Sequence, residues 1–387
     1  MRRGFSGEYS TRQLGGETVN AFVPQPLPPY PPPEITGSRA RRHEQALLAC
    51  GRLDSITQLL PEPDLFLYAY IRREALVSSQ IEGTQSSLSD LLLFELDEVP
   101  GVPFDDVVEV SNYIAAMNHG LERLRGGFPL SNRLLCEMHA RLLARGRGAR
   151  MQPGAFRRSQ NWIGGTRPGN PRFVPAPPEY VQDVMASLEA FLHEEELPFS
   201  ALIKAALAHV QFETIHPFLD GNGRIGRLLI ALTLHQDGVL REPLLYLSLY
   251  LKQHRMTYYE LLDGVRYDGD WEAWLDFFLE GVQVTATGAV DTADRLVTLF
   301  REDAQQIQNL GRASANTLRV FDALRSRPVA SIKDLRRRSD LSAPTVGRAV
   351  DALEEMGVVD EVTGRQRDRV YVYRRYLNIL NEGAEPL

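Results

Sequence analysis

The spacing of apolar residues predicts helices over most of the chain between about residues 44 and 280. Apolar side chains recur every three or four positions there, which places them on one face of a helix. The clearest stretches are residues 65–76, 88–96, 107–124, 132–143, 180–192 and 199–212. Residues 152–178 interrupt this pattern with Gly, Pro and two β-prone stretches. We expect a short β-hairpin there, standing out from an all-α domain.

The two ends of the chain follow different patterns. Residues 24–33 are rich in proline, whose fixed φ favours an extended arm or a strap over the surface. Residues 316–326, 331–338 and 342–356 are short helical stretches, and residues 357–373 alternate as a β-hairpin does. Three helices followed by a hairpin are typical of a winged helix–turn–helix domain. We expect this tail to bury a small core of its own.

These patterns divide the chain into five parts. We predict an N-terminal arm over residues 1–43, a helical region over 44–125 and a helical core over 126–285. A connecting helix over 286–315 then leads to the winged helix domain over 316–387. The length of 387 residues agrees with two or three domains rather than with one small core.

Composition narrows the class of protein. The formal net charge of -7 argues against a chain that coats nucleic acid over its whole surface. Cys50 and Cys136 are too few for a disulfide framework and fit no metal-ligand spacing, which favours a reducing cytoplasm. No apolar run follows the N-terminal arginines, and the longest uncharged apolar stretches are far shorter than a membrane span. We therefore expect a soluble, cytoplasmic protein without a membrane partner.

A polar motif lies between two strongly helical runs. Residues 216–227 read His-Pro-Phe-Leu-Asp-Gly-Asn-Gly-Arg-Ile-Gly-Arg. Gly221, Asn222 and Gly223 readily take the open backbone conformations of an anion nest, and the next helix adds its positive end. An ordinary turn between two helices needs only the Gly and Asn residues. It gives no reason for a base, an acid and two arginines in the same short stretch.

Four side chains give this motif its chemistry. Arg224 and Arg227 lie three positions apart and can bind phosphates as planar forks. Asp220 can hold a magnesium ion that bridges phosphates. His216 can be a neutral base near pH 7. Because the motif lacks the Gly-Lys-Ser/Thr of a P-loop, it predicts a different kind of phosphate site.

The motif His-Pro-Phe-x-Asp-Gly-Asn-Gly-Arg-x-x-Arg resembles the signature of the Fic family at every specified position. The resemblance implies an all-α Fic fold with a short β-hairpin flap. It also implies the transfer of AMP from ATP, with Mg2+, to a Tyr, Thr or Ser hydroxyl of a target protein. His216 would be the general base and Asp220 the metal ligand. The nucleotide-binding residues of the signature would be Gly221, Asn222, Gly223, Arg224, Ile225, Gly226 and Arg227.

Two further segments resemble parts of the family that bind the nucleotide. Residues 162–166 resemble the flap, which covers the nucleotide and docks the target backbone as an added strand. The flap residues concerned are Ile163, Gly164, Gly165 and Thr166. Arg255, Tyr258, Tyr259 and Arg266 occupy places where relatives line the adenine pocket, although some relatives have an amide in place of Arg266. For the two tyrosines, an ordinary core role stays open.

A second motif, Ser78-Ser-Gln-Ile-Glu82-Gly83, ends a helical run. Ser78 and Glu82 are four positions apart and share a helix face, and Gly83 suits a left-handed C-cap. The motif resembles the family's inhibitory motif, in which the glutamate pairs with the second arginine of the signature, here Arg227, and displaces the γ-phosphate. It precedes the signature, as in the class whose inhibitory helix lies at the front of the same chain. The resemblance implies an autoinhibited enzyme that also modifies itself.

The winged helix domain leaves other functions open. Residues 331–375 contain ten Lys and Arg against eight Asp and Glu, a weak electrostatic footprint for DNA. Winged helices also form protein contacts, so DNA and a second copy of the chain are both candidate partners. One alternative function is a DNA-binding transcription regulator whose pocket senses a nucleotide. Another is a Fic-fold transferase that uses a different nucleotide donor, because the nest binds phosphates whatever base is attached.

Overall fold

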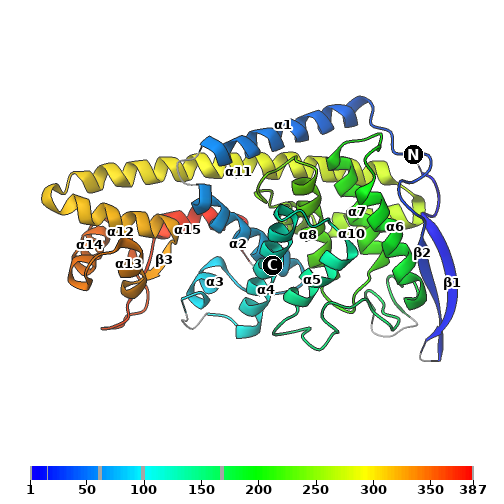
Figure 1. Ribbon diagram of the computed structural model, residues 1–387, viewed down its shortest axis with the longest axis horizontal. Coiled ribbons are helices and arrows are strands. Elements are labelled where there is room, and N and C mark those ends of the chain that lie inside the picture. The colour runs from blue at the N-terminus through cyan, green and yellow to red at the C-terminus, as the bar shows by residue number, and fades with distance from the viewer. Residues whose placement is uncertain (1, 15, 60–62, 97–100, 166–169, 386–387) are drawn as a thin grey trace.

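The computed structural model describes residues 2–14, 16–59, 63–96, 101–165 and 170–385. Its central part is a group of packed helices, as the apolar spacing predicted (Figure 1). These helices are α2 (Pro63–Ile81), α3 (Leu88–Phe94), α4 (Phe104–Arg125), α5 (Asn132–Leu142), α6 (Val181–His193), α7 (Ala201–Ile215), α8 (Asn222–Gln236), α9 (Ser248–Gln253) and α10 (Arg255–Asp268). The six stretches predicted for this region coincide with α2 to α7.

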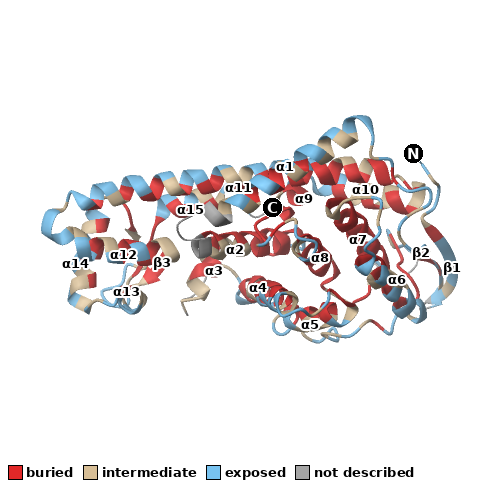
Figure 2. Cartoon of the chain, turned by 45° about the horizontal axis from the view of Figure 1, so that its top comes forward, coloured by how far each residue is buried: buried red, intermediate tan, exposed pale blue. Residues whose placement is uncertain are grey.

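Helix α7 forms the centre of this group. Every residue from Leu202 to Ile215 is buried, and the helix packs against α6, α8 and α10. Figure 2 shows α7 and α8 buried along most of their length. Because these residues are all buried, packing against the neighbouring helices fixes the position of α7. The predicted base, His216, follows directly at its C-terminal end.

Two long helices lie side by side along one edge of the molecule (Figure 1). Helix α1 (Gly37–Leu59) packs along α11 (Trp271–Gln308). The connecting helix predicted over residues 286–315 corresponds to the second half of α11, which runs without a break from Trp271 to Gln308. No helix in the described part of the chain is long and apolar enough to cross a membrane.

The N-terminal arm contains a β-hairpin that the sequence pattern did not reveal. Strand β1 (Gly7–Leu14) pairs antiparallel with β2 (Glu17–Pro24). Phe22 of β2 donates its backbone N–H to Val174 O (2.9 Å). The proline-rich stretch then runs over the surface, where Gln211 of α7 donates to Gln25 O (2.8 Å). The predicted surface strap is therefore confirmed, and the hairpin beside it supports the segment around Val174.

The predicted hairpin within residues 152–178 is present as one antiparallel bridge. Ile163 and Phe173 exchange backbone hydrogen bonds of 2.8 and 3.1 Å. Gly165 has a positive φ of 73° and lies close to Asn170 O, so a side chain at that position would be strained. Thr166 lies outside the described residues. The bridge holds the two sides of the flap together.

The C-terminal part has the winged helix–turn–helix arrangement that the sequence predicted. Its elements are α12 (Ser314–Ser326), β3 (Val329–Ser331), α13 (Ile332–Ser339), α14 (Ala343–Glu355), β4 (Asp360–Glu361), β5 (Val370–Val372) and α15 (Arg374–Asn381). The strands form a sheet in the order β3-β5-β4. The expectation of a separate small core was wrong, because one continuous apolar cluster includes both parts. Tyr376 of α15, for example, packs against Phe300 of α11 at 5.0 Å between ring centroids.

Candidate active site

His216 caps α7 in a left-handed conformation with φ of 50°, which is rare for a residue with a side chain. Arg157 holds this turn in place: its Nε donates to His216 O (2.9 Å), and its Nη2 donates to Ala176 O. The imidazole Nδ1 is buried and has no hydrogen-bond partner among the described residues. Such an unused buried nitrogen at a strained turn is a feature of functional sites.

The surroundings of His216 favour the neutral imidazole. Burial lowers its pKa to about 3, and the positive charges of Arg266 and Arg157 act in the same direction. A histidine with this pKa remains unprotonated throughout the physiological pH range. His216 can therefore accept a proton at pH 7 without first losing one.

The loop after His216 is held by side chains on both sides. Gly221 takes the left-handed conformation (φ 77°) that starts α8. The Asn222 side chain both accepts from Phe218 N and donates to Phe218 O, each at 2.8 Å. His139 of α5 stacks on Phe218 at 3.8 Å, and its Nε2 bonds Asp220 O (3.0 Å). The first N–H groups of α8 have no intrahelical acceptor, so this rigid loop presents them to an anion.

Arg224 and Asp220 lie next to each other on this loop. Asp220 Oδ1 accepts from Gly221 N (2.6 Å) and lies 3.6 Å from Arg224 Nη2. Arg224 is buried and pairs with Glu109 of α4 (3.1 Å), which also pairs with Arg147 (2.6 Å). In the described parts of the chain, no three His, Cys, Asp or Glu side chains gather into a metal site. Asp220 is therefore a single, partly exposed carboxylate.

Arg227 joins the signature to the 78–83 motif. Its Nε donates to Ser78 Oγ (2.8 Å), and its Nη2 donates to Ser78 O (2.9 Å) and Glu82 Oε1 (2.7 Å). Glu82 Oε1 also lies where a Cβ atom would stand on Gly223. Partial burial raises the pKa of Glu82, but the charge of Arg227 outweighs it and the net shift is downward. An anionic group thus lies at the N-terminus of α8. Gly83 follows with a positive φ of 101°, as predicted for the end of this helix.

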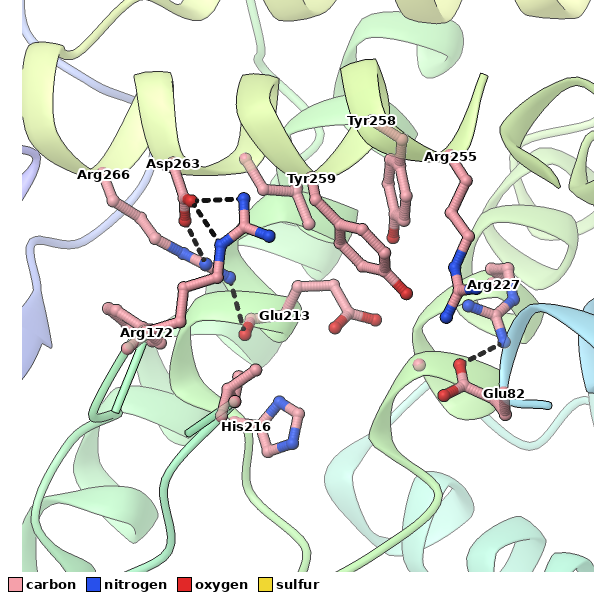
Figure 3. Close-up of a pocket in the computed structure, with 15 residues that line it drawn as sticks. Glu82, Arg172, Glu213, His216, Arg227, Arg255, Tyr258, Tyr259, Asp263 and Arg266 are labelled. Atoms are coloured by element: carbon pink, nitrogen blue, oxygen red, sulfur yellow. Dashed lines mark hydrogen bonds and ion pairs between the residues drawn. The ribbon is translucent and has the colours of Figure 1, made fainter. Parts of the chain in front are cut away.

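A cavity of about 300 Å³ opens beside this ion pair. Figure 3 shows the residues that line it, which come from the flap, α7, α8 and α10 and from the turns that follow α2 and α7. They are Glu82, Ile163, Gly164, Arg172, Phe173, Glu213, His216, Gly223, Arg227, Arg255, Tyr258, Tyr259, Leu262, Asp263 and Arg266. The structure therefore brings the predicted base, the second signature arginine, the flap and the predicted adenine-pocket residues to one cavity.

Six of the described residues predicted to bind the nucleotide do not line this cavity, and three of them, Gly221, Asn222 and Arg224, belong to the loop and first turn described above. The other three have different surroundings. Ile225 is buried in the core, and its N–H bonds Gly221 O (3.1 Å). Gly226 O accepts a hydrogen bond from His209 Nδ1 (2.9 Å). Gly165 packs on the far side of the flap turn, against Asn170. These residues shape the site without lining the cavity.

The two tyrosines predicted for the adenine pocket differ in burial and in their contacts. Tyr258 is 1% exposed, and its hydroxyl is held by His209 Nε2 (2.8 Å). Tyr259 is only partly buried and lies nearer the flap, where the Arg172 guanidinium is 5.8 Å from its ring. Arg172 itself pairs with Asp263 of α10 (2.8 Å), which ties the flap to this helix. Tyr259 is thus the more exposed of the two tyrosines that line the cavity.

Glu213 is a cavity residue that the sequence did not indicate. It is 6% exposed, and its Oε1 has no hydrogen-bond partner among the described residues. Figure 3 shows it between Arg266 and Arg227. Burial raises its pKa to about 7, although both arginines act in the opposite direction and Glu82 acts with it. A carboxyl group that changes charge near neutral pH therefore faces the cavity.

The supporting residues Arg157, His139 and Glu109 were also missed. Each acts from a different element on a residue of the signature, at separations of 59, 81 and 115 positions along the chain. No local spacing connects such pairs. A burial pattern could have pointed to Glu109, since it lies on the buried face of α4 next to Val108 and Val110.

Comparison with known families agrees with this geometry. Residues 40–122 match the Fic/DOC family N-terminal region, and residues 129–234 match the Fic/DOC family. Residues 314–360 match a winged helix-turn-helix DNA-binding domain. The chain therefore contains Fic/DOC N-terminal and Fic/DOC domains followed by a C-terminal winged helix domain.

Several known proteins are similar to this chain. It is 32% identical to the protein adenylyltransferase Fic of Aedes aegypti over 209 residues, which cover 53% of this chain and 39% of that protein. It is 35% identical to the protein adenylyltransferase fic-1 of Caenorhabditis elegans over 105 residues, 27% of this chain and 19% of that protein. The chain thus spans less than half the length of these relatives. The crystal structure of a Fic family protein from Desulfovibrio desulfuricans G20 shares the fold, with a TM-score of 0.57, 20% identity and coverage of 89% and 98%.

Proposed function

We propose that the protein transfers AMP from ATP to a hydroxyl side chain of a target protein, and of itself. The observation that carries this proposal is the position of His216 in one cavity with Gly223 and Arg227. A neutral base and an anion-binding loop around the same space are what AMP transfer requires. The relatives named protein adenylyltransferase support the same reaction.

The reaction follows from the roles of the residues around this cavity. His216 takes the proton of the target hydroxyl while the hydroxyl oxygen forms a bond to the α-phosphorus of ATP. The bond from that phosphorus to the bridging oxygen breaks, and pyrophosphate leaves with the electron pair. The N–H groups at the start of α8 and Arg227 bind the phosphate oxygens. Arg224, held by Glu109, supplies further positive charge.

A magnesium ion would be held by Asp220. A single carboxylate fits this ion, because nucleotide phosphates and water supply its other ligands in such sites. The metal would neutralise phosphate charge. His139 bonds the backbone O of Asp220, and Gly221 N donates to its Oδ1, so both contacts hold Asp220 in place on the loop.

Glu82 would inhibit this reaction. Its carboxylate lies on Gly223 and Arg227, two of the groups proposed to bind phosphate. An anion at the N-terminus of α8 competes directly with a phosphate group for the same N–H donors and the same arginine. ATP would therefore bind in a productive arrangement only when Glu82 moves away.

A nucleotide-sensing DNA-binding regulator is the second candidate, and the winged helix match supports it. A sensor requires neither a base nor a metal ligand, so His216 and Asp220 favour the enzyme. One experiment separates the two functions and also tests which nucleotide the protein uses. The protein is incubated with Mg2+ and α-labelled ATP, CTP, GTP or UTP in parallel, and its intact mass is measured. We expect AMP addition with ATP, and far slower addition for His216→Ala. A protein that binds ATP but never gains AMP, even as Glu82→Gly, would be a sensor.

A further inference from the structure

The last described residues of the chain lie against α2, the helix that ends just before Glu82. After α15, residues 382–385 run over α2 and α9. Gln80 Nε2 of α2 donates to Ala384 O (3.0 Å), and Arg73 Nη2 donates to Glu382 O. Lys252 of α9 donates to Glu385 O. We refer to residues 382–385 as the C-terminal segment. It connects the winged helix domain to the 78–83 motif.

Helix α2 carries these two sets of contacts on opposite faces. Ser78 and Glu82 are one helical turn apart, and both bond Arg227. Arg73 and Gln80 are two turns apart on the other side, and both bond the C-terminal segment. The end of α2 therefore lies between the phosphate-binding loop and the C-terminal segment.

Gln80 is the residue through which the C-terminal segment reaches Glu82. It is 1% exposed, and all of its amide groups are bonded. Its Nε2 donates to Ala384 O and also to Ser86 O (2.9 Å), while its Oε1 accepts from Lys252 Nζ (2.7 Å). Ser86 ends the turn that follows Glu82, so one amide holds both this turn and the C-terminal segment. If the segment leaves, buried donors of Gln80 and Lys252 lose their acceptors.

We infer that the C-terminal segment positions Glu82 on Arg227 through Gln80, so that a partner which displaces this segment releases the nucleotide site. The inference rests on the inhibitory role proposed for Glu82. The segment follows directly from α15, and α15 follows β5 of the winged helix sheet. The segment is therefore joined to this domain directly along the chain. Because such coupling is reciprocal, ATP binding would in turn loosen the segment.

The size of the effect follows from the hydrogen bonds involved. Release of the segment removes three hydrogen bonds from buried donors, one each from Arg73, Gln80 and Lys252. The bonds of Gln80 and of Lys252, whose Nζ also donates to Gln80, are the two that act next to Glu82. Two such bonds shift the equilibrium between the inhibited and released positions of Glu82 about tenfold. We therefore expect deletion of residues 382–387 to tighten ATP binding about tenfold, measured by isothermal titration calorimetry on the otherwise complete chain.

A pair of glycine substitutions provides a milder test. Gly383 has a φ of 75°, and a Cβ atom there would lie 3.2 Å from Gln253 Nε2, so Gly383→Ala should disturb the segment. Gly364, in the wing, has a φ of 63° and nothing within 4 Å, so Gly364→Ala carries the same backbone strain away from α2. We expect Gly383→Ala to tighten ATP binding by several-fold and Gly364→Ala to leave it unchanged. This pair decides the question if the deleted chain does not fold.

The same changes in the Glu82→Gly background show whether the segment acts through Glu82. If it does, deletion or Gly383→Ala adds nothing once Glu82 is absent. Equal tightening in both backgrounds would overturn the inference, and so would an unchanged ATP affinity of both segment variants with Glu82 present. If Glu82→Gly alone leaves ATP binding unchanged, the inhibitory role proposed for Glu82 fails instead. Hydrogen exchange of residues 78–86 gives a readout independent of catalysis, and it should rise in the deleted chain.

Discussion

Replacing Glu82 by glycine should raise the affinity for ATP about tenfold and increase self-modification. The substitution removes the carboxylate that lies on Gly223 and Arg227. Arg227 should remain in position, because its hydrogen bonds to Ser78 Oγ (2.8 Å) and Ser78 O (2.9 Å) are unaffected. The freed guanidinium and the N–H groups of α8 then bind phosphate in place of the carboxylate. Self-modification becomes faster because the phosphates are better positioned, since the general base, His216, is unchanged.

The magnitude follows from the exposure of the two partners. The ion pair spans 2.7 Å, and the side chains are 2% exposed for Arg227 and 36% exposed for Glu82. A fully enclosed hydrogen bond between charged groups contributes about 1.5–3 kcal/mol. Water around Glu82 screens this pair and reduces its contribution to about 1–2 kcal/mol. Each 1.4 kcal/mol corresponds to a tenfold change in affinity, so we expect a change of about 5- to 30-fold.

The assay compares the parent with Glu82→Gln and Glu82→Gly. Calorimetry measures the affinity for ATP and for AMP, and intact mass spectrometry measures self-modification. Glu82→Gln keeps the size of the side chain and removes its charge, so it should lie between the other two proteins. The affinity for ATP should increase more than the affinity for AMP, because the β- and γ-phosphates of ATP are the groups that compete with the carboxylate. Identical ATP affinities and modification rates for all three proteins, at every ATP concentration, would refute the reasoning.

Three further predictions concern the cavity and its loop. His216→Ala should slow AMP transfer about 10²- to 10⁴-fold with little change in ATP affinity. Because the pKa of His216 is about 3, this residue should not become protonated between pH 8 and pH 6, and the parent should not lose activity for that reason. Asp220→Ala should lower the transfer rate and flatten the magnesium titration, and an unchanged titration would exclude Asp220 as the metal ligand. For Glu213, whose pKa is raised to about 7, the folded state keeps a proton that the unfolded chain releases near pH 4.5. Its contribution to stability is therefore present below pH 4.5 and is lost as the pH rises to about 7, by about 1.4 kcal/mol per unit. In urea unfolding, the parent should lose stability relative to Glu213→Gln over this range, and a constant difference between them would contradict the raised pKa.

Much of this architecture could be predicted from the sequence because it depends on local patterns. The apolar spacing of α2 to α7 follows from burial of one helix face or, in α7, of all faces. The signature is equally local, since one loop and the first turn of α8 contain His216, Gly223 and Arg227. The wing was visible as alternation around Gly364. Each of these features needs only neighbours along the chain to define it.

The features that were not predicted depend on contacts between distant segments. Strand β1 reads as a polar, irregular stretch, and its pairing with β2 leaves it largely exposed. Arg157 supports His216 from another element, and no spacing links them. Helix α11 continues through Gly281, which leaves room for the Tyr250 ring, so the glycine reflects close packing and not the end of a helix. In each case the tertiary environment decided what the local sequence left open.

The boundary between the catalytic region and the winged helix domain shows the same dependence on distant contacts. The sequence places every residue of the proposed chemistry before residue 267, which makes the tail look separable. In the structure, α11 runs through the boundary, and α15 packs against both α11 and α2. Near the end of the described chain, Ala384 O accepts a hydrogen bond from Gln80, which is two residues before Glu82. A winged helix domain that only selected partners would not need to bond the buried side-chain amide of Gln80, next to the residue proposed to block the phosphate site. The arrangement therefore favours a tail that controls when the site can bind ATP.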